Sequence, residues 1–144
     1  GSPAALQGRE HLTTIPSTKI AAADAYKMAG ITAKDVDFAE VHDCFTVAEV
    51  VDTEDLGFFE KGTGATAARQ GETKLNSTIS INPSGGLKSK GHPIGATGVG
   101  QIAEVFEQLT DNAGERRVND AKIGLTQNFG ATGASCAVHI FQSV

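Results

Sequence analysis

One stretch of the sequence, residues 82–98, constrains the fold of this chain more than any other. It reads NPSGGLKSKGHPIGATG and contains five glycines, two prolines, two lysines and one histidine. Glycine has no side chain, so it lets the backbone approach a ligand closely, and the prolines restrict the freedom of the loop. Its one histidine, His92, exchanges a proton near neutral pH and lies just before an expected helix start. The pattern indicates an active-site loop rather than a linker.

The segments around this loop predict alternating helices and strands. Helices are expected over 17–29, with Ser17 as N-cap and Gly30 as C-terminal stop, over 45–56, and after Pro93. In the last helix, apolar residues keep the three- and four-residue spacing of an amphipathic helix: Val99, Ile102, Val105, Phe106 and Leu109. Strands are expected over 36–41, 78–82, 122–128 and 134–141, a loop over 57–71 and a tight turn over 129–133. The order α-β-α-β-α-β-β predicts an α/β domain with a layered mixed sheet.

Composition narrows the class of protein. The 144 residues are 40% hydrophobic and 20% charged, typical of a globular domain, and the net charge of −5 argues against nucleic-acid binding. No apolar run approaches the ~20 residues of a membrane span, and no secretory or peroxisomal signal is recognisable. Two cysteines suggest no disulfide framework, so we expect a reducing, cytoplasmic setting. Residues 1–11 are expected to be a linker that begins with a tag-removal scar, so the chain is expected to be a piece of a longer protein.

Three expected strands lead to residues that can carry chemistry. The first runs into His42-Asp43-Cys44-Phe45, the second leads to His92, and the third ends at Asn128-Phe129-Gly130. In open α/β sheets chemistry gathers beyond the carboxyl ends of the strands, so we expect these residues to converge on one site.

The cysteines and the other histidines allow more than one interpretation. Cys44 is either a small packed hydrophobe or a thiol whose pKa is lowered by His42 or His92. Cys136 is expected to pack in the core, and His139 on the opposite face of its strand to be structural or exposed. A zinc site built from His42, Cys44 and His92 lacks the paired spacings of known zinc sites, so no metal is expected.

Two motifs resemble those of the thiolase superfamily. The glycine–histidine loop is similar to the signature of the C-terminal thiolase domain, and His42-Asp43-Cys44-Phe45 is similar to the motif of the sterol-carrier-protein-type (lipid-transfer-protein-like) thiolases. The resemblance covers residues 12–144. It implies the C-terminal half of the two-part thiolase fold, and Claisen condensation of acyl-CoA or thiolysis of 3-oxoacyl-CoA.

The resemblance also implies partners. The nucleophilic cysteine would come from the chain's own N-terminal thiolase half, so this piece alone should not turn over. Coenzyme A thioesters would be substrates with no permanently bound cofactor, and the full-length protein would form a homo-oligomer.

The resemblance assigns roles to four residues. His92 would polarise the thioester carbonyl and help deprotonate the nucleophile, His42 would help to build an oxyanion site, and Gly130 would offer its backbone N–H to a second one. Degradative thiolases carry a catalytic Cys-x-Gly where this chain has Asn128-Phe129-Gly130. Cys44 would therefore replace the missing acid/base.

Other interpretations remain open on the sequence. One is a retro-aldolase that cleaves β-hydroxyacyl-CoA side chains, and another is a non-catalytic acyl-CoA-binding or assembly module. Lys88 and Lys90 in the loop are either solvated or contact the phosphates of coenzyme A.

Overall fold

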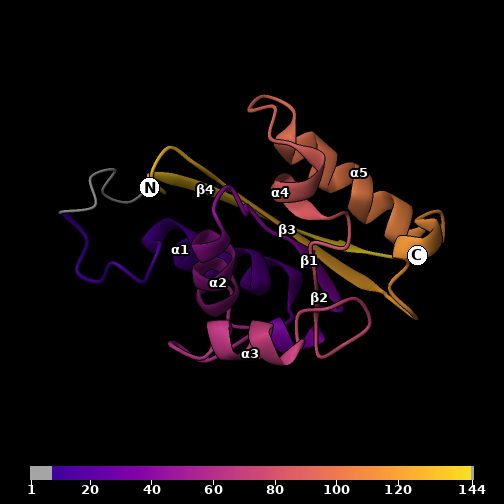
Figure 1. Ribbon diagram of the computed structural model, residues 1–144, viewed down its shortest axis with the longest axis horizontal. Coiled ribbons are helices and arrows are strands. Elements are labelled where there is room, and N and C mark those ends of the chain that lie inside the picture. Colours follow the sequence, from indigo (N-terminus) through magenta and orange to yellow (C-terminus); the bar gives the residue numbers. More distant parts are fainter. Residues whose placement is uncertain (1–7, 144) are drawn as a thin grey trace.

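A computed structural model of the chain describes residues 8–143. Its centre is a four-stranded sheet in the order β2-β1-β3-β4, and Figure 1 shows helices on both sides of it. The strands are β1 (Phe38–Glu40), β2 (Ser80–Ile81), β3 (Ile123–Gly130) and β4 (Ser135–Gln142). The predicted α/β class with a mixed sheet is confirmed. The expected tag scar lies outside the described residues, as does most of the expected linker.

Helices α1 (Pro16–Ala29), α2 (Thr46–Asp55) and α3 (Gly64–Gln70) lie on one side of the sheet. Helices α4 (Gly86–Lys90) and α5 (Thr97–Leu109) lie on the other. Two 3-10 turns, η2 (Ala33–Asp35) and η3 (Gly114–Arg116), complete the structure. Within the described residues, no helix has the length and apolar character needed to cross a membrane.

The sheet brings the functional strand ends to one edge. Strand β1 pairs in parallel with both β2 and β3, so all three end at the same side of the sheet. Strand β4 returns antiparallel to β3, with Asn128 opposite Ala137. Two apolar clusters hold the layers together. One, between α1 and the sheet, is built around Ala39, Val41 and Leu125, and the other joins Phe38 to Val105 of α5.

Helix α1 begins one residue earlier than predicted, which corrects the role of Ser17. Ile15 is the N-cap residue and Pro16 the first helical residue, because the fixed φ of proline suits that position. Ser17 therefore lies inside the first turn, and its hydroxyl donates to the carbonyl of Gly133 at 2.8 Å. The predicted stop at Gly30 is confirmed by its left-handed φ of 70°.

Two helices interrupt segments that were expected to be loops. Helix α3 lies inside the expected loop 57–71, and α4 lies inside the glycine-rich loop. At the start of α3, the backbone N–H of Gly64 donates to Glu54 Oε1 at 2.9 Å, and a Cβ on Gly64 would lie 3.0 Å from that side chain. Gly64 allows close contact with α2 and does not break the helix. The glycine content of residues 57–71 therefore wrongly predicted a loop.

Helix α5 is present as predicted, but most of its apolar residues face outward. Val99 is 70% exposed and Phe106 63%, and only Val105 of the five is buried. The buried residues on the sheet side are mostly polar: Thr97, Gln101, Glu104 and Gln108. They find partners there: Gln101 Nε2 donates to the carbonyl of Gln127, and Gln108 bonds Glu104 and the backbone of residues 116–118. The exposed apolar residues of α5 are therefore available to another surface.

Candidate functional site

Residues from three segments line one cavity at the carboxyl edge of the sheet. His42 and Cys44 follow β1, His92 lies between α4 and α5, and Gly130 ends β3. The structure brings all four together around a cavity of about 440 Å³. Its remaining lining residues are Ile94, Asn128, Phe129, Ala131 and Ala137.

His42 is the buried member of this group. Its Nδ1 is hydrogen-bonded to Asn128 Oδ1, and its backbone N–H donates to Gln127 Oε1 at 3.0 Å. The imidazole rings of His42 and His92 meet edge to face, with centroids 4.8 Å apart. Burial lowers the pKa of His42, and the neighbouring His92 acts in the same direction, while the bond to Asn128 opposes them. The uncharged ring is therefore the favoured form.

His92 is exposed at the rim, and Thr97 is the hydrogen-bond partner of one of its ring nitrogens. Its Nδ1 lies 2.6 Å from Thr97 Oγ1, and the Thr97 hydroxyl donates to the carbonyl of Pro93 at 3.2 Å. A hydroxyl has a single hydrogen to donate, so when Thr97 donates to Pro93 it accepts from Nδ1–H of His92. The neutral ring then has a free lone pair on Nε2, which makes this atom a proton acceptor.

Cys44 is half-buried and favours its protonated form. Burial raises the pKa of the thiol above its ordinary value, and the carboxylates of Asp52 and Asp43 add to the rise. A thiolate stabilised by His42 or His92, one of the two interpretations of the sequence, is therefore not what these surroundings favour. A protonated thiol at a cavity wall can deliver a proton.

The second cysteine and the fourth histidine lie apart from this chemistry. Cys136 is half-buried, with its sulfur 3.6 Å from Thr18 Oγ1. It belongs to neither apolar cluster, so the expected core position is corrected to a half-buried one beside polar side chains. His139 is exposed, with Nδ1 3.3 Å from Thr126 Oγ1.

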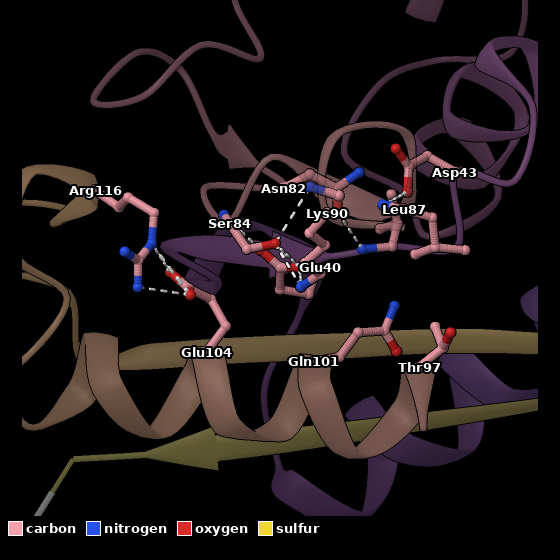
Figure 2. Close-up of polar contacts among 12 residues, drawn as sticks. Glu40, Asp43, Asn82, Ser84, Leu87, Lys90, Thr97, Gln101, Glu104 and Arg116 are labelled. Carbon is pink, nitrogen blue, oxygen red and sulfur yellow. Dashed lines mark hydrogen bonds and ion pairs between the residues drawn. The ribbon is translucent and has the colours of Figure 1, made fainter. Parts of the chain in front are cut away.

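The two loop lysines differ from each other, and neither lines the cavity. The Lys88 side chain is exposed. The ammonium of Lys90 points inward, 3.2 Å from Glu40 Oε2 and 2.6 Å from Ser84 Oγ (Figure 2). No ligand-holding group of three or more metal-binding side chains occurs among residues 8–143.

Three supporting residues were not singled out from the sequence. Asn128 holds His42, Thr97 holds His92, and Asp43 accepts a hydrogen bond from the N–H of Leu87 at 2.7 Å. Each lies within a motif that was noted for another residue. The partners of Asn128 and Asp43 lie 86 and 44 positions away, so local spacing carries no signal for these two residues. Thr97 lies only five positions from His92, so its role is the one that local spacing could have indicated.

With this geometry described, the chain can be compared with known proteins. Residues 2–143 match the family described as thiolase C-terminal domain-like. The chain is 52% identical over 137 residues to an acetyl-CoA acetyltransferase of Methanothermobacter thermautotrophicus, covering 95% of this chain and 36% of that protein. It is 46% identical over 117 residues to human sterol carrier protein 2, covering 81% of this chain and 21% of that protein. The chain thus spans about a third or less of these relatives.

Two solved structures share the fold. An Ltp2-ChsH2(DUF35) aldolase superimposes with a TM-score of 0.83 at 20% identity, over 94% of this chain and 34% of that one. The peroxisomal 3-ketoacyl-CoA thiolase of Saccharomyces cerevisiae gives 0.60 at 21% identity, over 92% of this chain and 30% of that one. The yeast enzyme is described as a five-layered α-β-α-β-α structure built from two core domains of identical topology.

Proposed function

Because the chain belongs to the thiolase C-terminal domain-like family, we propose that it is the C-terminal half of an acyl-CoA C-acetyltransferase. The reaction is thiolysis of a 3-oxoacyl-CoA, or the reverse Claisen condensation of two acyl-CoA molecules. The observation that carries this proposal is the cavity in which His42, Cys44 and His92 meet. A module that only binds acyl-CoA needs no such set of proton-transferring groups.

The nucleophilic cysteine is assigned to the part of the full-length protein outside this chain. This chain spans 36% of its acetyltransferase relative, and its own two cysteines have other surroundings. Cys44 has a raised pKa, and Cys136 is not part of the cavity lining. The Nε2 of His92 is suited to accept the proton of that nucleophilic cysteine, which then attacks as a thiolate.

In the first half of thiolysis, the thiolate of that cysteine attacks C3 of the 3-oxoacyl-CoA. The C2–C3 bond breaks, C3 becomes the carbonyl of an acyl-enzyme thioester, and the electron pair is left on C2 as the enolate of acetyl-CoA. Cys44 delivers its thiol proton to C2, and acetyl-CoA leaves. The raised pKa of Cys44 supports this role, because it keeps the proton on sulfur until C2 needs it.

In the second half, the thiol of coenzyme A gives its proton to the Cys44 thiolate and attacks the acyl-enzyme. The bond between the acyl carbon and the sulfur of the nucleophilic cysteine breaks, the shortened acyl-CoA leaves, and the nucleophile returns as a thiolate. Every proton taken from Cys44 is thereby restored. In the reverse direction the same thiol, as thiolate, removes a proton from the α-carbon of acetyl-CoA.

His42 and the backbone N–H of Gly130 are proposed to stabilise oxygens that become negative in these steps. A preorganised donor of this kind is worth about 3 kcal/mol. A neutral His42 donates from Nε2 only when Nδ1 accepts. The proposal therefore requires Asn128 to present its amide N–H to Nδ1, which a half-turn of the amide group allows.

Thiolysis of acetoacetyl-CoA by the full-length protein tests the proposal, with this chain alone assayed beside it. We expect activity in the full-length protein only. Turnover by this chain alone would mean that one of its own cysteines is the nucleophile and would overturn the role given to Cys44. Absence of thiolysis in the full-length protein, with coenzyme A still bound, would overturn the proposal. Cleavage of a β-hydroxyacyl-CoA would then identify an aldolase.

A further inference from the structure

The buried carboxylate of Glu40 lies outside the catalytic roles proposed above. Its side chain is fully buried at the end of β1, two residues before His42. Ser84 donates to it twice, from its backbone N–H at 3.0 Å and from its hydroxyl at 2.7 Å. Lys90 supplies the only opposite charge beside it within the described residues, at 3.2 Å. A buried charge of this kind is retained only when it is paired and hydrogen-bonded.

Ser84, Lys90 and Glu40 each contact the other two. The Ser84 hydroxyl donates to Glu40, accepts from the ammonium of Lys90 at 2.6 Å and accepts from the N–H of Gly86 at 3.2 Å. Figure 2 shows these three side chains pointing toward one another from β1, the glycine loop and the end of α4. The Lys90 side chain is 32% exposed. Its charge is thus directed into the protein rather than toward a ligand in solvent.

Helix α4 needs such an anchor because it is only five residues long, far shorter than an isolated helix requires in water. Its first turn is held by Asp43, which accepts from the N–H groups of Leu87 and Lys88. Its last residue is Lys90, which is held by Glu40. Two carboxylates on either side of His42 therefore fix the two ends of the helix that leads to His92.

His92 has few contacts of its own to fix its position. Residues 91–96 are all exposed, and the ring is hydrogen-bonded to Thr97. The backbone reaches it through Gly91, whose N–H bonds Leu87 of α4. The place of His92 relative to His42 therefore depends on how firmly α4 is attached to the segment that carries His42.

We propose that Lys90 and Glu40 are positioning residues that hold His92 at its working distance from His42, and that Lys90 is not a ligand for coenzyme A phosphate. This inference rests on the proposed thiolase function. For Lys90 it replaces both alternatives that the sequence left open, solvation and a phosphate contact. For Lys88, which is exposed, both alternatives stand.

The test compares Lys90→Met with Lys88→Met in the full-length protein, by steady-state thiolysis of acetoacetyl-CoA at low and high salt. We expect Lys90→Met to lower kcat about ten-fold or more, since small misplacements of a reacting group are costly, with KM for coenzyme A unchanged at both salt concentrations. Lys88→Met should keep the kcat of the wild type. Lys90→Arg preserves the charge and should therefore keep most of the wild-type kcat that Lys90→Met loses.

A second variant separates positioning from loss of folding. Glu40→Gln removes the ion pair and the buried negative charge, keeps one acceptor for Ser84, and leaves a Lys90 side chain that is already 32% exposed and can turn to solvent. This variant should therefore fold and should show the same fall in kcat. A salt-dependent rise in KM of Lys90→Met with unchanged kcat would overturn the inference in favour of a phosphate contact. A kcat equal to that of Lys88→Met would also overturn it. Absence of thiolysis in the wild type would instead contradict the proposed function.

Discussion

The two cysteines of this chain have different surroundings, and this difference decides which one can act on substrate. Cys44 lines the cavity with both histidines, whereas the sulfur of Cys136 lies beside Thr18 and Gln127. Burial raises the pKa of both thiols, so their ionisation does not distinguish them. Position alone supports our proposal that Cys44 carries the proton transfer.

Replacing Cys44 by serine in the full-length protein should abolish proton exchange at the α-carbon. We expect the exchange of acetyl-CoA methyl protons with deuterium oxide to fall by about 100-fold or more, because positioned acid–base catalysis contributes at least that factor. Mass spectrometry of the recovered acetyl-CoA measures it, and calorimetry should show nearly unchanged affinity for coenzyme A.

The matched control is Cys136→Ser, which should exchange at the wild-type rate because the hydroxyl can keep the contacts with Thr18 and Gln127. Equal losses of exchange in both variants, or loss of coenzyme A affinity in Cys44→Ser, would contradict the assignment of Cys44.

The glycine-rich segment works as a folded element rather than an open loop. Gly86 begins helix α4 with a left-handed φ of 64°, and a Cβ there would lie 2.4 Å from the carboxylate of Asp43. That carboxylate is the acceptor that holds the first turn of α4. Glycine is required at this position both by backbone conformation and by the close approach of Asp43.

Gly86→Ala should therefore destabilise the protein by at least about 2 kcal/mol, from the strained φ and the displaced Asp43 hydrogen bonds. Chemical denaturation of the full-length protein measures this loss. Gly95→Ala is the control within the same segment, because a Cβ there meets nothing within 4 Å, and its effect should stay within about 0.5 kcal/mol. Similar stability of the two variants would mean that α4 is not held through Asp43.

At the scale of the whole molecule, one face of α5 is an exposed apolar surface. Ile94, Val99, Ile102 and Phe106 are exposed along and just before α5, and an apolar groove of about 420 Å³ between α5 and the end of β4 lies beside them. A continuous apolar surface of this kind marks a site of contact. The proposed function predicts that the rest of the full-length protein covers this surface.

Phe106→Ala tests whether this surface is covered. If the N-terminal half buries Phe106, the substitution should cost about 3–5 kcal/mol of unfolding free energy in the full-length protein, as for other buried phenylalanines. Met28→Ala is the control, because Met28 is 89% exposed on α1 at the other side of the sheet, and it should cost no more than about 0.5 kcal/mol. Denaturant unfolding of the two variants compares them, and equally small effects would show that the α5 surface stays open.

The sequence by itself determined the elements whose signals are local. The strand ends, the stop at Gly30 and the amphipathic spacing of residues 97–109 predicted most of the helices and strands. Because parallel strands share a carboxyl edge, the same pattern also predicted that His42, Cys44, His92 and Gly130 would lie near one another.

Only the tertiary structure decided which partner each side chain has. Lys90 meets Glu40 across 50 positions and His42 meets Asn128 across 86, and spacing along the chain carries no information about such pairs. The same holds for α5, where periodicity defines an apolar face but not its direction. Polar residues of α5 could turn inward because the sheet and its connections supply their hydrogen bonds. The apolar face could then turn outward, where Val99, Ile102 and Phe106 are exposed.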